Sequence, residues 1–194
     1  MKIILASDSP RRKKLLGYLG IKFYVIPSDL NEAKVKESNP KALTQKLALA
    51  KALAVRRKVK TQDFLIIAAD TVVVLGKKIL GKPNNKAQAR EILNLLKGKV
   101  HEVITGVVVL DNTGQTIIDH EASKVFFKNF KNQDLEKYLD KNLFKDKAGA
   151  YGIQDLDDNI LEKYLGSYTN ILGLPLKKTI SILTKFGVKI KTDD

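Results

Sequence analysis

Short apolar runs alternate with helix-like repeats along the chain, and this alternation restricts the possible folds more than any other feature of the sequence. Runs rich in β-branched residues and bounded by turn-forming residues predict strands near 2–6, 64–69, 72–75, 99–110, 115–128 and 162–170. Segments of helical period lie between them and predict helices over 10–19, 40–57, 84–97, 131–141 and 174–186. The pattern is typical of an α/β protein. Hairpin-like segments at 72–80 and 99–128 favour a mixed sheet over a purely parallel one.

The chain has 194 residues, which suffice to bury a core as one domain or as two intimately packed lobes. Because it contains no cysteine, disulfides and thiolate metal sites are excluded, and catalysis must rest on oxygen, lysine, arginine or metal chemistry. No apolar run approaches the roughly 20 residues of a membrane span, and the first residues lack the apolar segment of a secretory signal. The sequence therefore predicts a cytoplasmic protein without a membrane partner.

The formal net charge of +14 predicts a positive field that could attract nucleic acid, anionic lipid or a small polyphosphate. The lysines are scattered, and no arginine-rich tail or repeat of aromatic and basic residues gathers them into a nucleic-acid footprint. A solvated lysine-rich surface is the favoured interpretation. A basic nucleic-acid-binding module is the alternative function.

The first predicted strand runs into a serine-rich, strongly basic turn, LASDSPRRKKLL. Ser9 is a natural N-cap and Pro10 fits the first helical position, so a helix is predicted to begin there. Arg11 and the cations after it then occupy the positive end of the helix dipole, which costs about 0.3–1 kcal/mol per exposed charge. A bound anion would offset this cost, because backbone N–H groups, hydroxyls and guanidinium groups all bind phosphate. A capped helix with a solvated basic end explains the segment about as well.

A second candidate site lies in FLIIAADTVVVLGKKILGKP, where the apolar run is predicted to end at Asp70 and Thr71. A carboxylate at a strand terminus can hold Mg²⁺ or orient a water molecule. Alternatively, Asp70 caps a turn and Thr71 begins the next strand. Lys82 could project from its Gly-Lys-Pro turn towards Asp70, or could be an ordinary exposed lysine. The glycines of this segment lack the ending of a Walker A loop, which disfavours a P-loop NTPase.

Two lysines of the helix predicted over 40–57 could also reach a site. On a helical wheel Lys46 falls inside the apolar arc and Lys51 falls at its edge. Burial of the aliphatic stem with a solvated ammonium group explains both positions, so periodicity does not choose between them. Glu32 lies in a polar loop and by itself would be interpreted as an exposed residue.

The segment DKAGAYGIQ combines small residues with Tyr151 and Gln154. Small residues allow the backbone to approach a ligand closely, and an amide can read the edge of a base. A tight connection with a packed tyrosine is the simpler interpretation. His101 and His120 lack the spacing of a helical metal site and are interpreted as structural.

Taken together, these segments resemble the Maf family of nucleoside triphosphate pyrophosphatases. LASDSPRRKKLL matches the family opening LASxSPRRxxLL, and AADT, GKP, HEVITGV, DKAGAYGIQ and GLPL follow in order, so that the resemblance spans residues 3–176. It implies a twisted mixed sheet with packed helices that form two lobes around a deep cleft, a Maf/ITPase-like fold. The single domain would cover residues 1–194, and it would be able to pair into a homodimer.

The resemblance implies that a nucleoside triphosphate is hydrolysed between its α- and β-phosphates to the monophosphate and pyrophosphate. The cofactor would be a divalent cation, Mg²⁺, Mn²⁺ or Co²⁺. The substrate would be the partner of this site, with no stable binding of nucleic acid.

The resemblance also gives roles to individual residues. Asp70 matches the catalytic base and Glu32 an acid that assists metal binding, so that both would hold the metal. Matches to phosphate-binding positions are Ser7, Ser9, Arg11, Arg12, Lys51 and Lys82. Matches to the specificity positions of the branch acting on dTTP and UTP are Arg11, Thr71 and Gln154. Two residues depart from the family pattern: Asn31 stands where an acid usually precedes Glu32, and Asp155 follows the glutamine where glycine is common.

Overall fold

A seven-stranded mixed sheet forms the framework of the structure, a computed structural model that describes residues 1–190. The strands are β1 (Lys2–Leu5), β2 (Phe23–Val25), β3 (Phe64–Leu75), β4 (Lys78–Leu80), β5 (Val100–Asp111), β6 (Thr116–Phe127) and β7 (Leu161–Leu165). Their order is β2-β1-β3-β5-β6-β7, and β4 pairs with β3. Strand β1 is parallel to β2 and β3, whereas β4 is antiparallel to β3 and β7 to β6. The predicted mixed sheet is confirmed.

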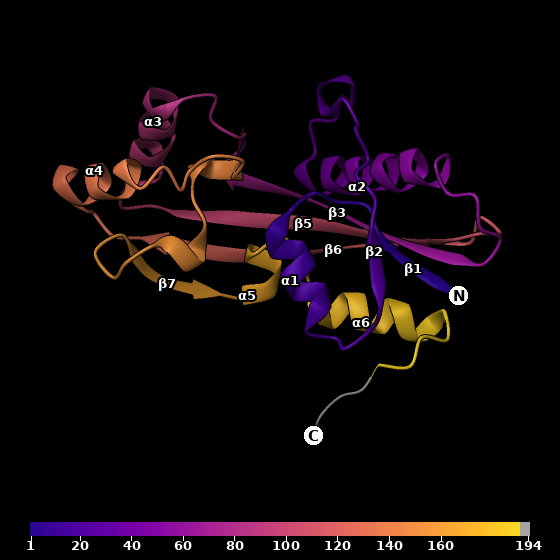
Figure 1. Cartoon of the computed structure of the whole chain (residues 1–194). Coiled ribbons are helices and arrows are strands. Elements are labelled where there is room, and N and C mark those ends of the chain that lie inside the picture. Colours follow the sequence, from indigo (N-terminus) through magenta and orange to yellow (C-terminus); the bar gives the residue numbers. More distant parts are fainter. Residues whose placement is uncertain (191–194) are drawn as a thin grey trace. The chain divides into compact units, whose positions relative to one another are not determined.

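The helices follow the sequence pattern with small shifts at their ends (Figure 1). They are α1 (Pro10–Gly17), α2 (Pro40–Arg56), α3 (Lys86–Leu96), α4 (Asn132–Asp140), α5 (Tyr168–Ile171) and α6 (Leu176–Lys185). Short 3₁₀ turns are η1 (Glu32–Lys34), η2 (Ala148–Ala150) and η3 (Ile153–Asp155). The strand predicted over 162–170 is wrong in its second half, because the Ser167 hydroxyl accepts from the Asn170 N–H and starts α5.

The described chain separates into two compact units. Within the described residues, unit 1 comprises Met1–Asp70, Thr105–Glu121 and 173–190, and unit 2 comprises Thr71–Ile104 and Ala122–Leu172. Strands β3, β5 and β6 therefore each contribute residues to both units. No helix within residues 1–190 has the length and apolar character needed to span a membrane.

In unit 1, α2 packs on the sheet through small residues. Ala48, Ala52 and Val55 belong to a buried cluster that includes Ile66 of β3. Gly106 of β5 allows the helix to approach, since a Cβ at this position would lie 2.5 Å from the backbone carbon of Thr44. Helices α2 and α6 lie on opposite faces of the strands of this unit (Figure 1).

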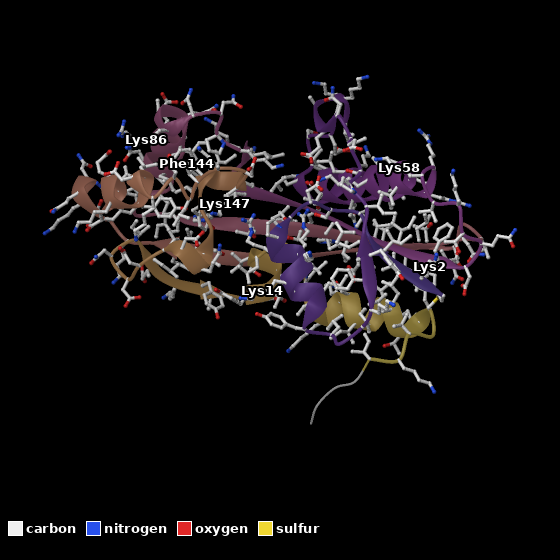
Figure 2. All side chains as sticks on the ribbon, in the orientation of Figure 1. Lys2, Lys14, Lys58, Lys86, Phe144 and Lys147 are labelled. Atoms are coloured by element: carbon white, nitrogen blue, oxygen red, sulfur yellow. The ribbon has the colours of Figure 1, made fainter. Side chains whose placement is uncertain are left out.

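In unit 2, α3 and α4 lie side by side over a core that contains the fully buried Phe144 (Figures 1 and 2). His101 belongs to this core: its Nε2 is 2.7 Å from the hydroxyl of Tyr151, and its ring meets Phe127 edge to face at 4.9 Å. Burial lowers the pKa of His101 to about 4 and raises the pKa of Tyr151. His101 is therefore neutral at pH 7.

Candidate functional site

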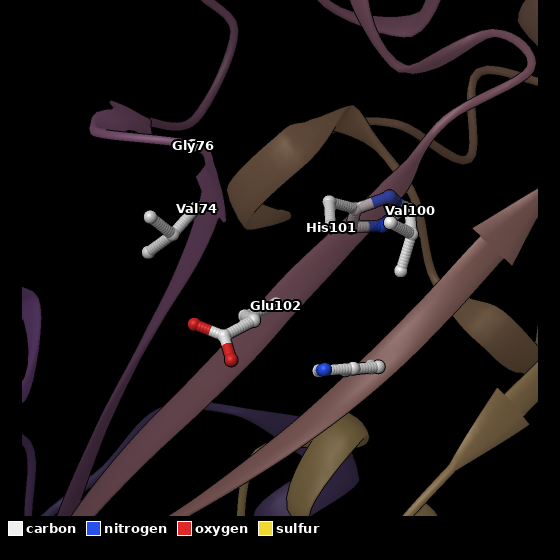
Figure 3. A pocket seen from close by; sticks show the side chains of 6 residues that line it. Val74, Gly76, Val100, His101 and Glu102 are labelled. Carbon is white, nitrogen blue, oxygen red and sulfur yellow. The ribbon is translucent and has the colours of Figure 1, made fainter.

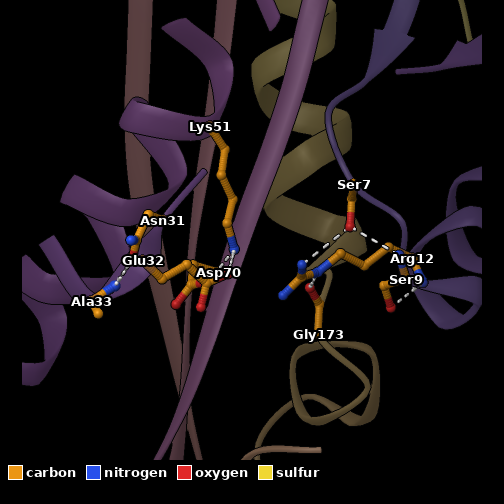
Figure 4. Close-up of polar contacts among 9 residues, drawn as sticks. All are labelled: Ser7, Ser9, Arg12, Asn31, Glu32, Ala33, Lys51, Asp70 and Gly173. Carbon is orange, nitrogen blue, oxygen red and sulfur yellow. Dashed lines mark hydrogen bonds and ion pairs between the residues drawn. The ribbon is translucent and has the colours of Figure 1, made fainter. Parts of the chain in front are cut away.

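The turn between β1 and α1 holds its own arginine in place. The Ser9 hydroxyl accepts from the Arg12 N–H at 3.4 Å and caps α1, which begins at Pro10 as predicted. The Ser7 hydroxyl accepts from the Ser9 N–H and from Arg12 Nη1, both at 3.2 Å. Arg12 Nε donates to the carbonyl of Gly173 at 2.7 Å (Figure 4). The guanidinium is thus held by two acceptors from distant parts of unit 1.

A second group of charged residues in unit 1 surrounds one ammonium group. Lys51 Nζ, from α2, lies 2.5 Å from Asp70 Oδ1 and 2.7 Å from Glu32 Oε1 (Figure 4). The side chains of Lys51 and Asp70 are each 8% exposed, and that of Glu32 is 38% exposed. Two carboxylates therefore converge on one buried lysine.

The electrostatics of Arg12 connect these two groups. Burial lowers the pKa of Arg12, the charge of Asp70 raises it, the charge of Arg11 lowers it, and the charge of Glu32 raises it. Arg12 therefore interacts with both carboxylates that face Lys51. The serine turn, the guanidinium and the carboxylate pair form one electrostatic neighbourhood within unit 1.

The prediction that Asp70 ends a strand is wrong. Strand β3 continues from Phe64 to Leu75 without a break, and Asp70 lies inside it with 6% of its surface exposed. A buried carboxylate is tolerated when an opposite charge and hydrogen bonds compensate it, and Lys51 provides both. The sequence shows the polar residue but not its partner, which stands 19 positions earlier.

The placement of Lys46 inside the buried arc of its helix is also wrong. Lys46 is exposed and pairs with Glu37, whereas Lys51 is buried. The face of α2 that meets the sheet includes Thr44, which packs against Gly106. This contact turns the helix so that Lys51, and not Lys46, points inward.

Asn31 supports the residue that follows it. Its side-chain oxygen accepts from the Ala33 N–H at 3.2 Å and caps η1, which carries Glu32 (Figure 4). Asparagine is a strong N-cap residue, so this departure from the family pattern keeps a local structural role. Glu32, which the sequence alone would leave in an exposed loop, is brought to Lys51 by this turn.

The donor set of Asp70 and Glu32 fits a divalent cation of the Mg²⁺ type. Both hard carboxylates face the ammonium group of Lys51, and Mg²⁺ usually takes one or two carboxylates and completes its shell with water and phosphate oxygens. Across the part of the chain that the structure describes, no group of three or more His, Cys, Asp or Glu side chains could hold a metal ion. The two carboxylates therefore fit a cation whose remaining ligands would be water and the phosphate oxygens of a substrate.

The remaining predicted site residues belong to unit 2. Thr71 follows Asp70 on β3, and Lys82 is exposed in the turn after β4. The Gly149 N–H donates to the Gly81 carbonyl at 3.1 Å, which brings the Lys82 turn beside the segment that leads to Gln154. Gln154 Nε2 donates to Asp155 Oδ2 at 2.8 Å. The roles of these residues stay predictions.

Two residues that hold the site in place were not among the predicted site residues. Gly173 supplies the carbonyl that binds Arg12, and Gly106 fixes the approach of the helix that carries Lys51. Both lie in segments that match the family, GLPL and HEVITGV, which is the signal that could have identified them. Neither has a side chain, so reasoning from side-chain chemistry overlooks them.

A pocket of about 160 Å³ lies in unit 2 (Figure 3). It is lined by Val74, Gly76, Val100, His101, Glu102 and Lys124. Ligand pockets usually enclose about 300–1,000 Å³, so this pocket is small for a nucleotide. The structure describes every site residue predicted above, and none of them lines it.

Comparison with known proteins places these features in a family. A family model described as Maf-like protein matches residues 2–186. A relative from Alkaliphilus metalliredigens, named dTTP/UTP pyrophosphatase, is 45% identical over 185 residues, which cover 95% of each chain. A relative of the same name from Desulforamulus reducens is 44% identical over 189 residues, which cover 97% of this chain and 98% of the other.

Solved structures share the fold at much lower identity. The HAM1 protein from Coxiella burnetii superposes with a TM-score of 0.53 at 14% identity and covers 95% of this chain and 99% of its own. The Staphylococcus aureus Ham1 protein gives a TM-score of 0.53 at 13% identity, covering 96% and 97%. At such identities the likeness concerns the fold, and it confirms the predicted α/β class.

Proposed function

Because the chain belongs to the Maf-like protein family, we propose that it hydrolyses dTTP and UTP between the α- and β-phosphates, releasing the nucleoside monophosphate and pyrophosphate. The names of the relatives support this substrate class. The observation that carries the proposal is the buried Lys51 ammonium between Asp70 and Glu32, in the electrostatic neighbourhood of Arg12. Cations and carboxylates in this combination suit a polyphosphate bound with a divalent cation.

The serine turn is proposed to bind phosphate oxygens. Arg11 and Arg12 supply guanidinium groups, and Ser7 and Ser9 supply hydroxyls at the positive end of α1. The hydrogen bonds from Arg12 to Ser7 and Gly173 orient its guanidinium before substrate arrives. Preorganised donors of this kind stabilise charge in a transition state without having to reorganise.

Asp70 and Glu32 are proposed to hold Mg²⁺, Mn²⁺ or Co²⁺, which when bound would neutralise phosphate oxygens and make water more acidic. Asp70 accepts the proton of the water that attacks the α-phosphorus. The bond from that phosphorus to the bridging oxygen breaks, and pyrophosphate leaves. Lys51 and Lys82 bind phosphate oxygens and compensate the charge that develops on the leaving group.

Base recognition is proposed to rest on Arg11, Thr71 and Gln154. The single domain over residues 1–194, its two lobes around a cleft, the homodimer and the cytoplasmic location also stay predictions. The reaction itself can be tested independently of all of them.

The test is a panel of nucleoside triphosphates in Mg²⁺, Mn²⁺ or Co²⁺, with the products separated and identified. We expect pyrophosphate and monophosphate from UTP and dTTP, and loss of both products when a chelator removes the metal. Release of orthophosphate in place of pyrophosphate would contradict the proposed bond cleavage. No release from any triphosphate, together with tight salt-sensitive binding of DNA or RNA, would support the basic nucleic-acid-binding module instead.

A further inference from the structure

Asp155 departs from the family pattern and has no role in the reaction proposed above. Its Oδ2 lies 2.9 Å from Lys147 Nζ and accepts a hydrogen bond from Gln154 Nε2 at 2.8 Å. All three residues belong to unit 2, and Figure 2 labels Lys147. One carboxylate oxygen thus joins a lysine to the predicted specificity glutamine.

Lys147 fixes the position of that carboxylate. The side chain of Lys147 is 9% exposed and that of Asp155 is 18% exposed. The Lys147 ammonium also donates to the carbonyl of Leu143. Lys147 is buried and Asp155 is partly buried, so separating the pair would leave the ammonium group away from water without its charged partner.

The side chain of Gln154 is exposed, and the carboxylate favours one orientation of its amide. An ionised carboxylate accepts hydrogen bonds and donates none, so it can bind the amide only through Nε2. A rotation of the amide by 180° would place Oε1 against Oδ2 of Asp155, two acceptors facing each other. The amide therefore keeps its nitrogen on Asp155 and directs its carbonyl oxygen away from it.

An amide with a fixed orientation can distinguish pyrimidine bases that a rotating amide cannot. Uracil and thymine carry an acceptor at C4 and a donor at N3, whereas cytosine carries a donor at C4 and an acceptor at N3. The sugar and phosphates hold the base in one position. In that position, the amide orientation that pairs with uracil or thymine is the reverse of the one that pairs with cytosine. A glutamine that flips freely would accept both.

We propose that Asp155, anchored by Lys147, is a positioning residue that holds Gln154 in one orientation and thereby selects uracil and thymine nucleotides against cytosine nucleotides. This inference rests on the proposed function, in which Gln154 reads the base. The departure from glycine at position 155 then adds a hydrogen bond that tightens specificity.

The backbone of Gly152 leaves the space for this arrangement. A Cβ at Gly152 would lie 2.6 Å from Asp155 Oδ2, 2.6 Å from Gln154 Nε2 and 2.9 Å from Lys147 Cε. All three of these atoms are in side chains, and they pack directly on the glycine. Only a residue without a side chain permits the three groups to meet there.

The experiment measures kcat/KM for UTP and for CTP with each variant, and compares the ratio. Asp155→Ala is expected to lower the UTP/CTP ratio about tenfold, the worth of one oriented hydrogen bond, mainly by raising the value for CTP. The double variant Lys147→Met/Asp155→Ala is expected to behave in the same way without a buried unpaired lysine. Asp158→Ala, an exposed acid in the same loop, is the matched control and is expected to keep the wild-type ratio.

The ratio separates positioning from stability, because a partly unfolded enzyme loses activity on both substrates equally. An unchanged ratio in the folded double variant would overturn the inference. If the wild-type enzyme releases pyrophosphate from no triphosphate, the proposed function itself fails. If it turns over UTP and CTP equally well, the function stands and the inference about Asp155 is wrong.

Discussion

Lys51 Nζ, on a helix, lies 2.5 Å from Asp70 Oδ1, inside a strand, and both side chains are almost fully buried. The two groups do not depend on each other equally. Lys51 has a second carboxylate partner in Glu32 at 2.7 Å. The carboxylate of Asp70 forms its ion pair with Lys51. Substitutions on the two sides of this pair should therefore differ in their effects.

Asp70→Asn should keep the fold and lose turnover. Loss of a general base costs about 10²–10⁴ in rate, while Lys51 keeps Glu32 as its counterion. Circular dichroism checks that the fold is kept, and pyrophosphate release checks that turnover is lost. The matched control is Asp29→Asn, which alters an exposed lysine–aspartate pair at the same 2.5 Å distance and should keep wild-type activity.

Lys51→Met should destabilise the protein by about 3–5 kcal/mol, because it leaves the carboxylate of Asp70 buried beside an apolar side chain. Urea unfolding gives the free energy. A Lys51→Met protein as stable as the wild type would show that Asp70 does not need this counterion.

Arg12→Lys should lower kcat/KM for UTP about 10²-fold although it conserves charge. Arg12 donates from two separate nitrogens, Nε to the Gly173 carbonyl and Nη1 to the Ser7 hydroxyl, and lysine lacks this planar fork with its fixed donor directions. Steady-state kinetics provide the measurement. Arg57→Lys, at the exposed end of α2, is the control and should leave kcat/KM unchanged.

Gly106→Ala should destabilise unit 1 and reduce activity together. The added Cβ would meet the backbone of Thr44 at 2.5 Å, and overpacking of this kind typically costs about 1–3 kcal/mol. The urea midpoint should fall, and turnover should fall because α2 carries Lys51 away from Asp70. Gly17→Ala, where nothing lies within 4 Å of the new Cβ, should not lower the midpoint.

His101 should make stability depend on pH. Its pKa is about 4 in the folded protein against 6.5 as its ordinary value, so the unfolded chain binds the proton more readily. The stability contributed by neutral His101 is complete above pH 6.5 and is lost as the pH falls towards 4, by about 3 kcal/mol. Urea unfolding between pH 4 and 7 should show this slope, and His101→Gln should reduce it. Equal slopes in both proteins would contradict the prediction.

The sequence predicted those elements whose signals are local. Helix α1 begins at its predicted serine cap, and the five longer helices were each found within a few residues of their bounds. Strand β2 and helix α5 were missed because three or four residues carry no measurable period. Asp70 was misplaced at a strand end because the charge that permits its burial comes from α2, a contact that no local pattern contains.

For the candidate site, the resemblance pointed to Lys51, where periodicity did not choose between Lys46 and Lys51, and to Glu32, which by itself would be interpreted as an exposed loop residue. The structure brings these two residues together with Asp70, and holds Arg12 through Gly173. The backbone contributions of Gly173 and Gly106 could not be derived from side-chain chemistry, since they depend on which segments meet in three dimensions.

Strand β1 pairs in parallel with β3 from Lys2↔Phe64 to Leu5↔Ile67. Successive side chains of a strand face opposite sides of the sheet, so a slip of one residue would turn the carboxylate of Asp70 away from α2. A single residue inserted between Phe64 and Asp70 would then abolish activity, although every proposed catalytic side chain would still be present in the sequence. The number of residues between Phe64 and Asp70 therefore matters to the site as much as the identity of its charged side chains.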